Sequence, residues 1–533
     1  MKRIVVVGGG TAGWLTAAYL AAKLGENSDQ KLKITLIESS DIPTISVGEA
    51  TTPSLRATLA DIGLDENEFM RACNATFKHG ILFSNWTHAP NVDPDDEYFH
   101  PFERPLRAGT DGLEGYWLRG LDPQNRKFED AVSIQHQLAK SNLAPKSVND
   151  RPYDSPIPYA YHLDAGLLAD VLKKSGKTHG VEHVVDTVLS VESASNGDIS
   201  DIKLASGKII SGDFFIDCSG FSSILIGKHY KQTFKDCSRV LFCDSAVTMQ
   251  IPNSPNQTIP PYTRSTACAN GWIWDIGLKN RRGVGYVYSS TYIDKNEAEK
   301  ELKKYLGDNM SEIPVRHINF RVGYRETQWH KNCVAVGLSS GFIEPLESTG
   351  IHLVEQAVWS LVSMLPRYFN GINPQSQFNK IIANHYEMAI NFVKYHYLLS
   401  KREDSQFWLD NVDEKSWTPW LRERVETWQG SYPDIYDLEY LHSIFDHASY
   451  QFVYFGMEGR PKINSLGGRR DKFATKIFDR VSKGVVNAKS RLPNHNEYLN
   501  QIHKGSNDSV RVRDVETMAT VNASIRTLPN NYT

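Results

Sequence analysis

Two carboxylates that could take part in chemistry lie in residues 337–352, GLSSGFIEPLESTGIH, where Glu344 and Glu347 stand among glycine, serine and apolar residues. One interpretation is structural: Ser348 or Thr349 caps a helix that begins here, and Glu347 is favourable at its positive N-terminal end. The other is functional: the free N–H groups of that helix hold an anion or a cofactor while a carboxylate faces a reaction. Taken alone, the segment favours the cap.

A glycine-rich turn near the N-terminus indicates a nucleotide site. In RIVVVGGGTAGWLTAAYLAAKLG an apolar β-branched run precedes Gly8, Gly10 and Gly13, and a helical pattern follows. These glycines predict a tight turn, close approach of a pyrophosphate and helix–strand packing. The next strand, KITLIES, ends at Glu38, an acid placed for a ribose hydroxyl and unfavourable to a 2′-phosphate. The pattern predicts FAD or NAD, and a purely structural glycine turn is the alternative.

Two later strands favour FAD over NAD. GDFFIDCSGFSS carries Asp217 at its end, and the apolar run of KNCVAVGLSSGF ends at Gly337. Flavoproteins of the glutathione-reductase type have such late strands, whose ends lead to the flavin ribityl chain and ring. A helix beginning near Thr349 would then direct its N-terminus at the flavin and at a small anion beside it.

The elements that must position these residues predict a mixed α/β fold. We expect an FAD-binding region of the glutathione-reductase/aromatic-hydroxylase type over residues 1–360, with substrate-side segments interleaved at about 70–150 and 238–330. Period-two alternation in 238–330 predicts an inserted antiparallel sheet, and residues 158–177 predict a helix. The C-terminal pattern is mainly helical, with a substrate-side region over 361–490 and a loosely packed tail over 491–533.

Composition indicates a cytoplasmic globular protein without nucleic-acid or membrane partners. The 533 residues are 40% hydrophobic and 23% charged with a net charge of −3, which gives no reason to expect a polyanionic partner. No segment approaches the ~20 apolar residues of a spanning helix. The start, MKRIVVVGGG, is too short in apolar residues for an export signal. The six scattered cysteines predict buried free thiols, and neither a disulfide framework nor a metal site is expected.

Five segments together resemble the flavin-dependent halogenases of the tryptophan-halogenase family, over roughly residues 1–455. GGGTAGW is similar to the dinucleotide turn of that family, and ATFKHGILFSNW to the segment that bears its catalytic lysine, here Lys78. GWIWDIGL is similar to the signature W-x-W-x-I-P, with Gly277 in place of the proline. GFIEPLESTGIH is similar to the flavin and halide segment, and YFHPF to a substrate-pocket segment.

The resemblance implies that reduced FAD, oxygen and a halide generate hypohalous acid, which passes through a tunnel to a separate substrate site. Lys78 would hydrogen-bond the hypohalous acid or form a haloamine, and Ser348 would help to orient the same oxidant. Glu347 would support this step and take the ring proton, whereas Glu344 stays unassigned. The halide would lie at Thr349 and Gly350. The residues expected to bind the cofactor are Gly8, Gly10, Thr11, Ala12, Gly13, Glu38, Glu49, Ala50, Asp217, Gly337, Gly341 and Ile351.

The resemblance also implies a substrate pocket and a redox partner. His100, Phe102, Ser348 and Phe452 would contact a small aromatic substrate, and Trp272 and Trp274 would crowd the flavin and block monooxygenase-type access. A separate NAD(P)H-dependent flavin reductase would supply FADH2 to a monomer or homodimer. Members acting on free tryptophan carry adjacent tyrosines and a glutamate before a Phe-Trp-Leu-Asn run. The present YLHSIFDHASYQFVYFGM lacks this clamp, so we expect simpler indoles, phenols or a larger substrate instead.

Structural alternatives stand beside these roles. A lone lysine such as Lys78 is ordinarily a surface residue with a buried stem, His100 an ordinary loop histidine, and Trp272 with Trp274 core residues of a strand. A flavin-dependent aromatic hydroxylase would explain the cofactor but not Lys78 with the two tryptophans. A non-catalytic flavin-binding protein is the further alternative.

Overall fold

A parallel sheet carries the glycine turn. A computed structural model describes residues 2–25, 31–41, 48–109, 111–307, 313–438, 444–462 and 470–504. Strand β1 (Arg3–Val7) lies between β2 (Lys33–Glu38) and β14 (Phe214–Asp217), parallel to both. The sheet order is β10-β2-β1-β14-β23-β22, with β10 (Glu182–Val185), β23 (Cys333–Ala335) and the antiparallel β22 (Trp329–His330). Both faces of β1 are buried, as expected for an apolar run in a parallel sheet.

Residues 158–177, predicted to be one helix, form a strand and a helix. β9 (Ala160–Asp164) precedes α7 (Ala165–Thr178). The Asp164 side chain caps α7 by accepting hydrogen bonds from the backbone N–H groups of Gly166 and Leu167. β9 pairs with β3 (Gly48–Ala50) and β4 (Thr76–Lys78), which explains its extended backbone. In this three-stranded sheet β9 lies between the strand that ends at Lys78 and the one that holds Glu49.

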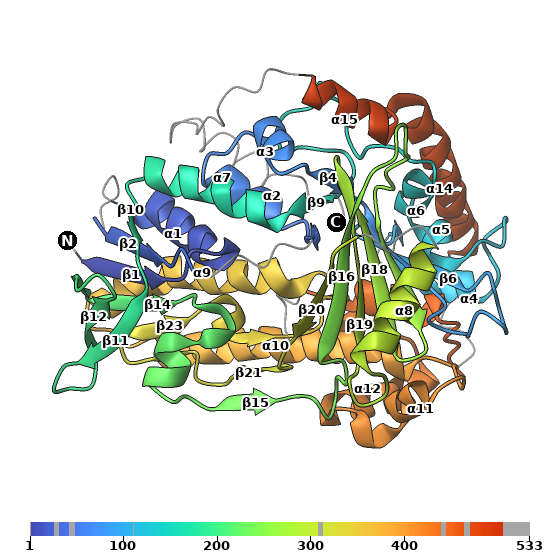
Figure 1. Cartoon of the computed structure of the whole chain (residues 1–533). Helices are drawn as coiled ribbons and strands as arrows, with labels where there is room; N and C mark the ends of the chain where they lie inside the picture. The colour runs from blue at the N-terminus through green and yellow to red at the C-terminus, as the bar shows by residue number, and fades with distance from the viewer. Residues whose placement is uncertain are drawn as a thin grey trace.

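The predicted inserted sheet has seven strands, in the order β20-β16-β19-β18-β17-β5-β6. Five of them are β16 (Ser245–Pro252), β17 (Thr263–Cys268), β18 (Gly271–Gly277), β19 (Arg281–Tyr288) and β20 (Val315–Asn319). β5 (Gly80–Ser84) and β6 (Glu97–Pro101) complete it from an earlier part of the chain. The pairing is antiparallel as predicted, except that β5 joins β17 in parallel. Figure 1 shows this sheet and the parallel sheet on opposite sides of the molecule, with α9 and α10 running between them.

The C-terminal part is helical, as predicted. Its helices are α9 (Thr349–Phe369), α10 (Gln375–Leu398), α11 (Gln406–Val412), α12 (Pro419–Gly430), α13 (His447–Gly456), α14 (Asp471–Arg491) and α15 (His495–His503). The expected tail from residue 491 therefore includes a packed helix, since Tyr498 and Leu499 of α15 are buried. Residues 505–533 lie outside the described part of the chain.

The remaining elements connect or cover these layers. Helix α1 (Thr11–Leu24) contacts α7 and α9 beside the parallel sheet. The other helices are α2 (Leu55–Asp61), α3 (Glu66–Ala72), α4 (Glu114–Leu118), α5 (Phe128–Val132), α6 (Gln135–Lys140) and α8 (Lys295–Leu306). The short strands are β7 (Arg107–Ala108), β8 (Asp111–Gly112), β11 (Val188–Ser193), β12 (Ile199–Leu204), β13 (Ile209–Ser211), β15 (Phe234–Asp236), β21 (Gly323–Arg325) and β24 (Gly341–Phe342).

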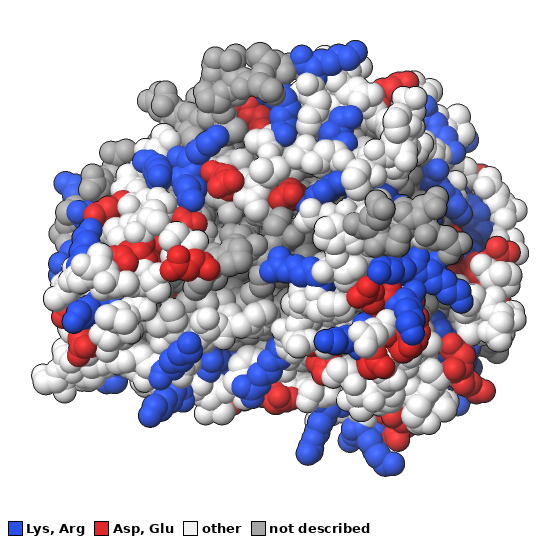
Figure 2. All heavy atoms as spheres, in the orientation of Figure 1, with Lys and Arg blue, Asp and Glu red and all other residues white. Residues whose placement is uncertain are grey.

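Surface and thiols agree with the composition. Figure 2 shows basic and acidic side chains interspersed on the face drawn. All six cysteines are free, five of them buried and Cys268 partly so, which confirms the expectation of free thiols. Across the described ranges, no helix is both long and apolar enough to cross a bilayer. Within the same ranges, no group of three or more His, Cys, Asp or Glu residues is arranged to hold a metal ion.

Candidate active site

A cavity of about 540 Å³ opens where the parallel strands end at their carboxyl edge. Fifteen residues singled out in the sequence line its wall: Gly8, Gly10, Thr11, Ala12, Glu38, Glu49, Ala50, Trp272, Trp274, Gly337, Gly341, Ser348, Thr349, Gly350 and Ile351. Ligands of α/β proteins bind at this edge, where the loops after neighbouring strands converge. The cavity therefore gathers most of the predicted cofactor and halide residues in one place.

The glycine turn has the predicted physics. Gly8 has φ +118°, and a Cβ there would lie 2.1 Å from the carbonyl oxygen of Cys218, the residue that follows β14. A Cβ at Gly13 would lie 1.9 Å from the Gly8 carbonyl oxygen, so Gly13 lets the helix pack on the turn and does not line the cavity. By contrast, a Cβ at Gly10 would meet nothing within 4 Å. Open space over backbone N–H groups at the start of α1 fits a pyrophosphate.

The predicted serine cap of α9 is wrong. Ser348 occupies the N-cap position but has φ +61°, and its side chain makes no capping hydrogen bond. Its hydroxyl instead accepts a hydrogen bond from the Lys78 ammonium at 2.8 Å. A Cβ at Gly350 would meet nothing within 4 Å, so the uncapped N–H groups of the first turn adjoin open space. This arrangement suits a small anion.

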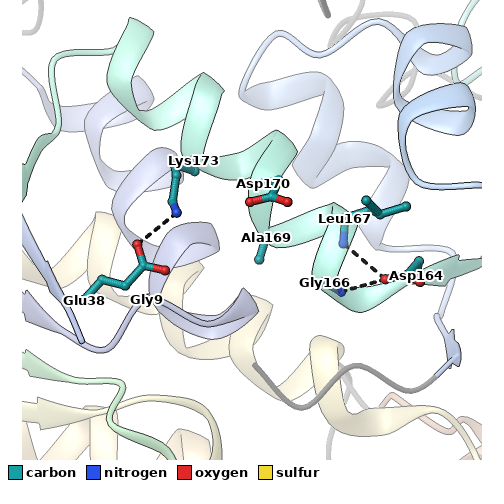
Figure 3. Close-up of a pocket in the computed structure, with 8 residues that line it drawn as sticks. All are labelled: Gly9, Glu38, Asp164, Gly166, Leu167, Ala169, Asp170 and Lys173. Atoms are coloured by element: carbon teal, nitrogen blue, oxygen red, sulfur yellow. Dashed lines mark hydrogen bonds and ion pairs between the residues drawn. The ribbon is translucent and has the colours of Figure 1, made fainter. Parts of the chain in front are cut away.

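Glu38 is fixed by two basic partners at the adenosine end. One oxygen of its carboxylate, Oε2, lies 3.0 Å from the Lys173 ammonium and 2.7 Å from His183 Nε2. Figure 3 shows the Lys173 contact beside a second pocket of about 390 Å³ along α7, which Asp170 also lines. Because Oε2 takes both partners, Oε1 is left to accept ribose hydroxyl groups. The position fits the predicted ribose role.

Asp217 does not line the cavity, in contrast to the prediction. It is fully buried, and its Oδ2 accepts hydrogen bonds from the backbone N–H groups of Leu225 and Ile226, each at 2.8 Å. Its Oδ1 accepts one from the Ser219 N–H at 3.1 Å. The carboxylate thus holds the turn after β14, whose residues 218–222 do line the cavity.

The two tryptophans line the 540 Å³ cavity, and Glu344 supports one of them. Trp272 and Trp274 project from β18 onto the cavity wall with ring centroids 6.3 Å apart. The Trp272 indole N–H donates to Glu344 Oε2 at 3.0 Å, and the Tyr397 hydroxyl donates to the same oxygen at 2.9 Å. Burial raises the pKa of Glu344, partly offset by these two hydrogen bonds. Glu344 therefore has a structural position behind the cavity wall.

Lys78 is fully buried and faces a second cluster. Its ammonium donates to the Ser348 hydroxyl and, at 3.1 Å, to the Thr51 carbonyl oxygen. It also lies over the Phe102 ring, 5.1 Å from the centroid. An ammonium group has three donors, so one remains for a reactant. Burial lowers the pKa of Lys78 from 10.5 to about 7, with nearby Glu347 acting in the opposite direction.

Glu347 is held between two histidines. His100 Nδ1 lies 3.0 Å from Oε1 and 3.1 Å from Oε2 of the carboxylate, and His396 Nε2 lies 3.0 Å from Oε1. Burial alone would raise the pKa of Glu347, but the two histidines outweigh it and lower the pKa to about 2. His396 Nδ1 in turn lies 2.7 Å from the Tyr98 hydroxyl. Glu347 is therefore an anion next to Lys78.

Aromatic rings line the region around His100. Its ring centroid lies 5.6 Å from that of Phe392 on α10 and 6.3 Å from that of Phe452 on α13. Phe392 stacks on Phe445 at 4.0 Å. Of the predicted substrate residues, Phe102 thus contacts Lys78, His100 contacts Glu347 and Phe452 lies beside His100, and none of the three lines the 540 Å³ cavity. Such a cluster offers flat apolar contacts to an aromatic ring.

Comparison with known proteins identifies the family. The family model for tryptophan halogenase matches residues 3–470. The chain belongs to the tryptophan halogenase family. A tryptophan halogenase from Shewanella frigidimarina has a similar structure, with a TM-score of 0.90 and 36% identity over 95% of this chain and 98% of that one. BrvH, a flavin-dependent halogenase from Brevundimonas sp. BAL3, has a TM-score of 0.82 and 33% identity over 94% and 99%.

A curated relative agrees. The 7-chloro-L-tryptophan 6-halogenase KtzR of a Kutzneria species is 35% identical over 521 residues, 93% of this chain and 98% of its own. The predicted fold class and the predicted enzyme class, a flavin-dependent halogenase acting on an aromatic substrate, are confirmed. Membership implies use of FAD with halide and oxygen, and supply of reduced flavin by a separate reductase.

Three residues of this halogenase site escaped the sequence reasoning. His396 and Phe392 lie one turn apart on α10, within the buried run Ala389–Leu398, and Tyr98 lies on β6. Their roles depend on contacts across almost 300 residues of sequence, such as the 298 that separate Tyr98 from His396. The one local signal is that this buried end of α10 holds polar side chains, Asn391, Lys394 and His396, among apolar and aromatic ones.

Proposed function

We propose that this halogenase makes hypohalous acid in the 540 Å³ cavity and uses it at Lys78 to halogenate a small aromatic substrate. The supporting observation is the position of Ser348, which lines the cofactor cavity and at the same time binds the buried Lys78 ammonium. An oxidant leaving the cavity past Ser348 would reach the remaining donor of Lys78. FAD, reduced by a separate NAD(P)H-dependent reductase, supplies the electrons that convert oxygen and halide into this oxidant.

The chain's residues divide the work. Gly10, Thr11 and Glu38 hold the dinucleotide, and the first turn of α9 at Thr349 and Gly350 holds the halide. Lys78 donates a hydrogen bond to the hypohalous acid and makes its halogen more electrophilic. With a pKa of about 7, it can also give up a proton when the oxygen departs. Glu347 supplies negative charge beside the ring as the halogen adds and the ring proton leaves.

We further propose that indole-like or phenolic substrates are preferred to free tryptophan. Phe102, Phe452 and His100 supply apolar and aromatic contacts near Lys78. Ring contacts of this kind recognise an aromatic group without requiring an amino-acid backbone. Rapid, regioselective halogenation of free L-tryptophan would contradict this part of the proposal.

The test is a substrate panel of indole, phenol and L-tryptophan with protein, flavin reductase, NADH, FAD and bromide, analysed by mass spectrometry. Bromine incorporation supports the proposal, whereas addition of one oxygen would indicate a hydroxylase. The Lys78→Ala variant should bind FAD normally and lose bromination. Unchanged bromination by this variant would remove Lys78 from the mechanism.

A further inference from the structure

The contacts of His100 are those of an oriented base. Both oxygens of Glu347 lie within 3.1 Å of Nδ1, so Nδ1 carries the hydrogen and donates it to the carboxylate. In the neutral ring the lone pair is then on Nε2. Among the residues that the structure describes, the hydrogen bonds recorded for the His100 ring all involve Nδ1. Nε2 is therefore left to accept a proton from a bound molecule.

The opposite side of Glu347 is fixed by a directional chain. Tyr98 is buried, and burial together with Glu347 raises the pKa of its hydroxyl, which therefore stays protonated and donates to His396 Nδ1. His396 must then carry its hydrogen on Nε2, which lies 3.0 Å from Glu347 Oε1. The carboxylate thus lies between two histidine rings and orients that of His100 through Nδ1–H, as a carboxylate orients the imidazole of a hydrolytic triad.

We propose that His100 Nε2 is the atom that removes the proton from the substrate ring, and that Glu347 acts through His100 while His396 and Tyr98 are positioning residues. The inference deepens the proposed function and rests on it. As the ring carbon bonds to the halogen, the oxygen–halogen bond breaks with its electron pair on oxygen, which takes a proton from Lys78 and leaves as water. The ring C–H electrons return to the π system, and the proton passes to Nε2.

The position of His100 supports this assignment. Its side chain is 8% exposed, and its ring lies beside Phe392 and Phe452 in the aromatic cluster expected to hold the substrate. Lys78 and Glu347, the other charged groups at this point, come from β4 and from the turn before α9. Glu347 already accepts a hydrogen bond from His100 and lies 3.0 Å from His396 Nε2, which makes it a weak proton acceptor by itself. His100 combines a free acceptor atom with an adjacent anion.

The decisive variant is His100→Asn. An asparagine amide N–H replaces Nδ1–H and retains the donor to Glu347, but the variant has no Nε2. The assay measures bromination of indole and of ring-deuterated indole. The wild type should show an isotope effect near 1, because addition of the halogen limits the rate. His100→Asn should be slower by about 10²–10⁴-fold, as for loss of a general base, and should show a clear primary isotope effect.

Controls separate this role from a structural one. His317→Asn removes a histidine from a comparable but half-exposed pair, 3.2 Å from Glu299, and should leave rate and isotope effect unchanged. FAD affinity and thermal stability should be the same in His100→Asn as in the wild type. A slower His100→Asn with no isotope effect, or a rate within about threefold of the wild type, would overturn the assignment.

Two measurements distinguish failure of this inference from failure of the proposed function. ¹⁵N NMR of the histidines, with the His100 signals assigned from their loss in His100→Asn, should show hydrogen on Nδ1 and none on Nε2 at neutral pH. The reverse tautomer would overturn the inference whatever the activity. Chemical trapping of hypobromous acid from bromide, FADH2 and oxygen needs no aromatic substrate, and its absence in the wild type would refute the proposed function.

Discussion

Replacing Lys78 with methionine separates the chemical role of the ammonium from its effect on folding. The unfolded chain protonates a lysine up to pH 10.5, whereas the buried side chain does so only below about 7. Between these values the unfolded state binds more protons, so wild-type stability rises with pH. The destabilisation is fully present below pH 7 and absent above 10.5. Methionine carries no such charge.

The size of the effect follows from the two pKa values. One unit of pKa corresponds to about 1.4 kcal/mol. Burial of Lys78 therefore lowers the free energy of unfolding by about 4 kcal/mol at pH 7 and by about 2 kcal/mol at pH 9. The stability difference between Lys78→Met and the wild type should therefore shrink by about 2 kcal/mol over this interval. The absolute stability gain of Lys78→Met is smaller than burial alone implies, because the oxygens of Ser348 and Thr51 lose their hydrogen-bond donor in the variant. The pH dependence is the diagnostic quantity.

The assay is urea unfolding followed by tryptophan fluorescence at pH 7 and pH 9, together with bromination of indole. Lys78→Met should lose at least about 10²–10³-fold in activity, as for removal of a hydrogen-bond donor to a developing negative charge. Lys394→Met is the matched control, because burial also lowers the pKa of Lys394 to about 7 and its partner is Asn411. It should show the same pH dependence and keep its activity. If wild type and Lys78→Met unfold with the same pH dependence, the reasoning about burial is wrong.

Three further variants test the cofactor side. Lys173→Met should weaken FAD binding by about two- to fivefold in fluorescence titrations, because a partly exposed ion pair contributes about 1 kcal/mol or less to fixing Glu38. Binding of FMN, which lacks the adenosine, should be unchanged. Gly350→Ala should raise the KM for bromide about tenfold or more without unfolding, since its methyl group enters open space beside the α9 N–H groups. Glu344→Leu should lower the free energy of unfolding by about 2–5 kcal/mol in denaturant titrations, because Trp272 loses its acceptor. Glu344→Gln keeps an acceptor oxygen and should lower the free energy of unfolding only slightly. Equal losses in the two variants would contradict the role given to that oxygen.

Local chemistry explains which predictions succeed. The glycine turn and Glu38 were predictable because one strand–turn–helix unit of about 30 residues contains them and its geometry is set by sterics. A helix beginning near Thr349 was predicted and α9 does begin there, but the predicted cap by Ser348 or Thr349 was not correct. Ser348 has the left-handed backbone, and its hydroxyl binds Lys78, 270 residues away in the chain. Because a capping preference reflects only neighbouring residues, it does not reveal a hydrogen-bond partner that is distant in the sequence.

Other differences have the same origin. Ala160–Asp164 forms a strand because β3 and β4 lie on either side of it, although the following residues are helical. Asp217 stands at the end of β14 as predicted, but the backbone N–H groups of the next turn occupy its carboxylate. The resemblance to a family brought Lys78 into consideration, and burial in the fold explains why its chemistry differs from that of a surface lysine.

Residues 344–350 lie between the 540 Å³ cavity and the cluster around His100. Ser348, Thr349 and Gly350 line the 540 Å³ cavity, where we propose that the oxidant is made, while Glu347 contacts His100 in the aromatic region where we propose that the substrate binds. On this proposal, the two regions can evolve separately. Replacements on α10 and α13 would change which aromatic rings are accepted and leave oxidant production intact. To broaden the substrate range of this enzyme, residues 344–350 should therefore be kept and residues of α10 and α13 varied.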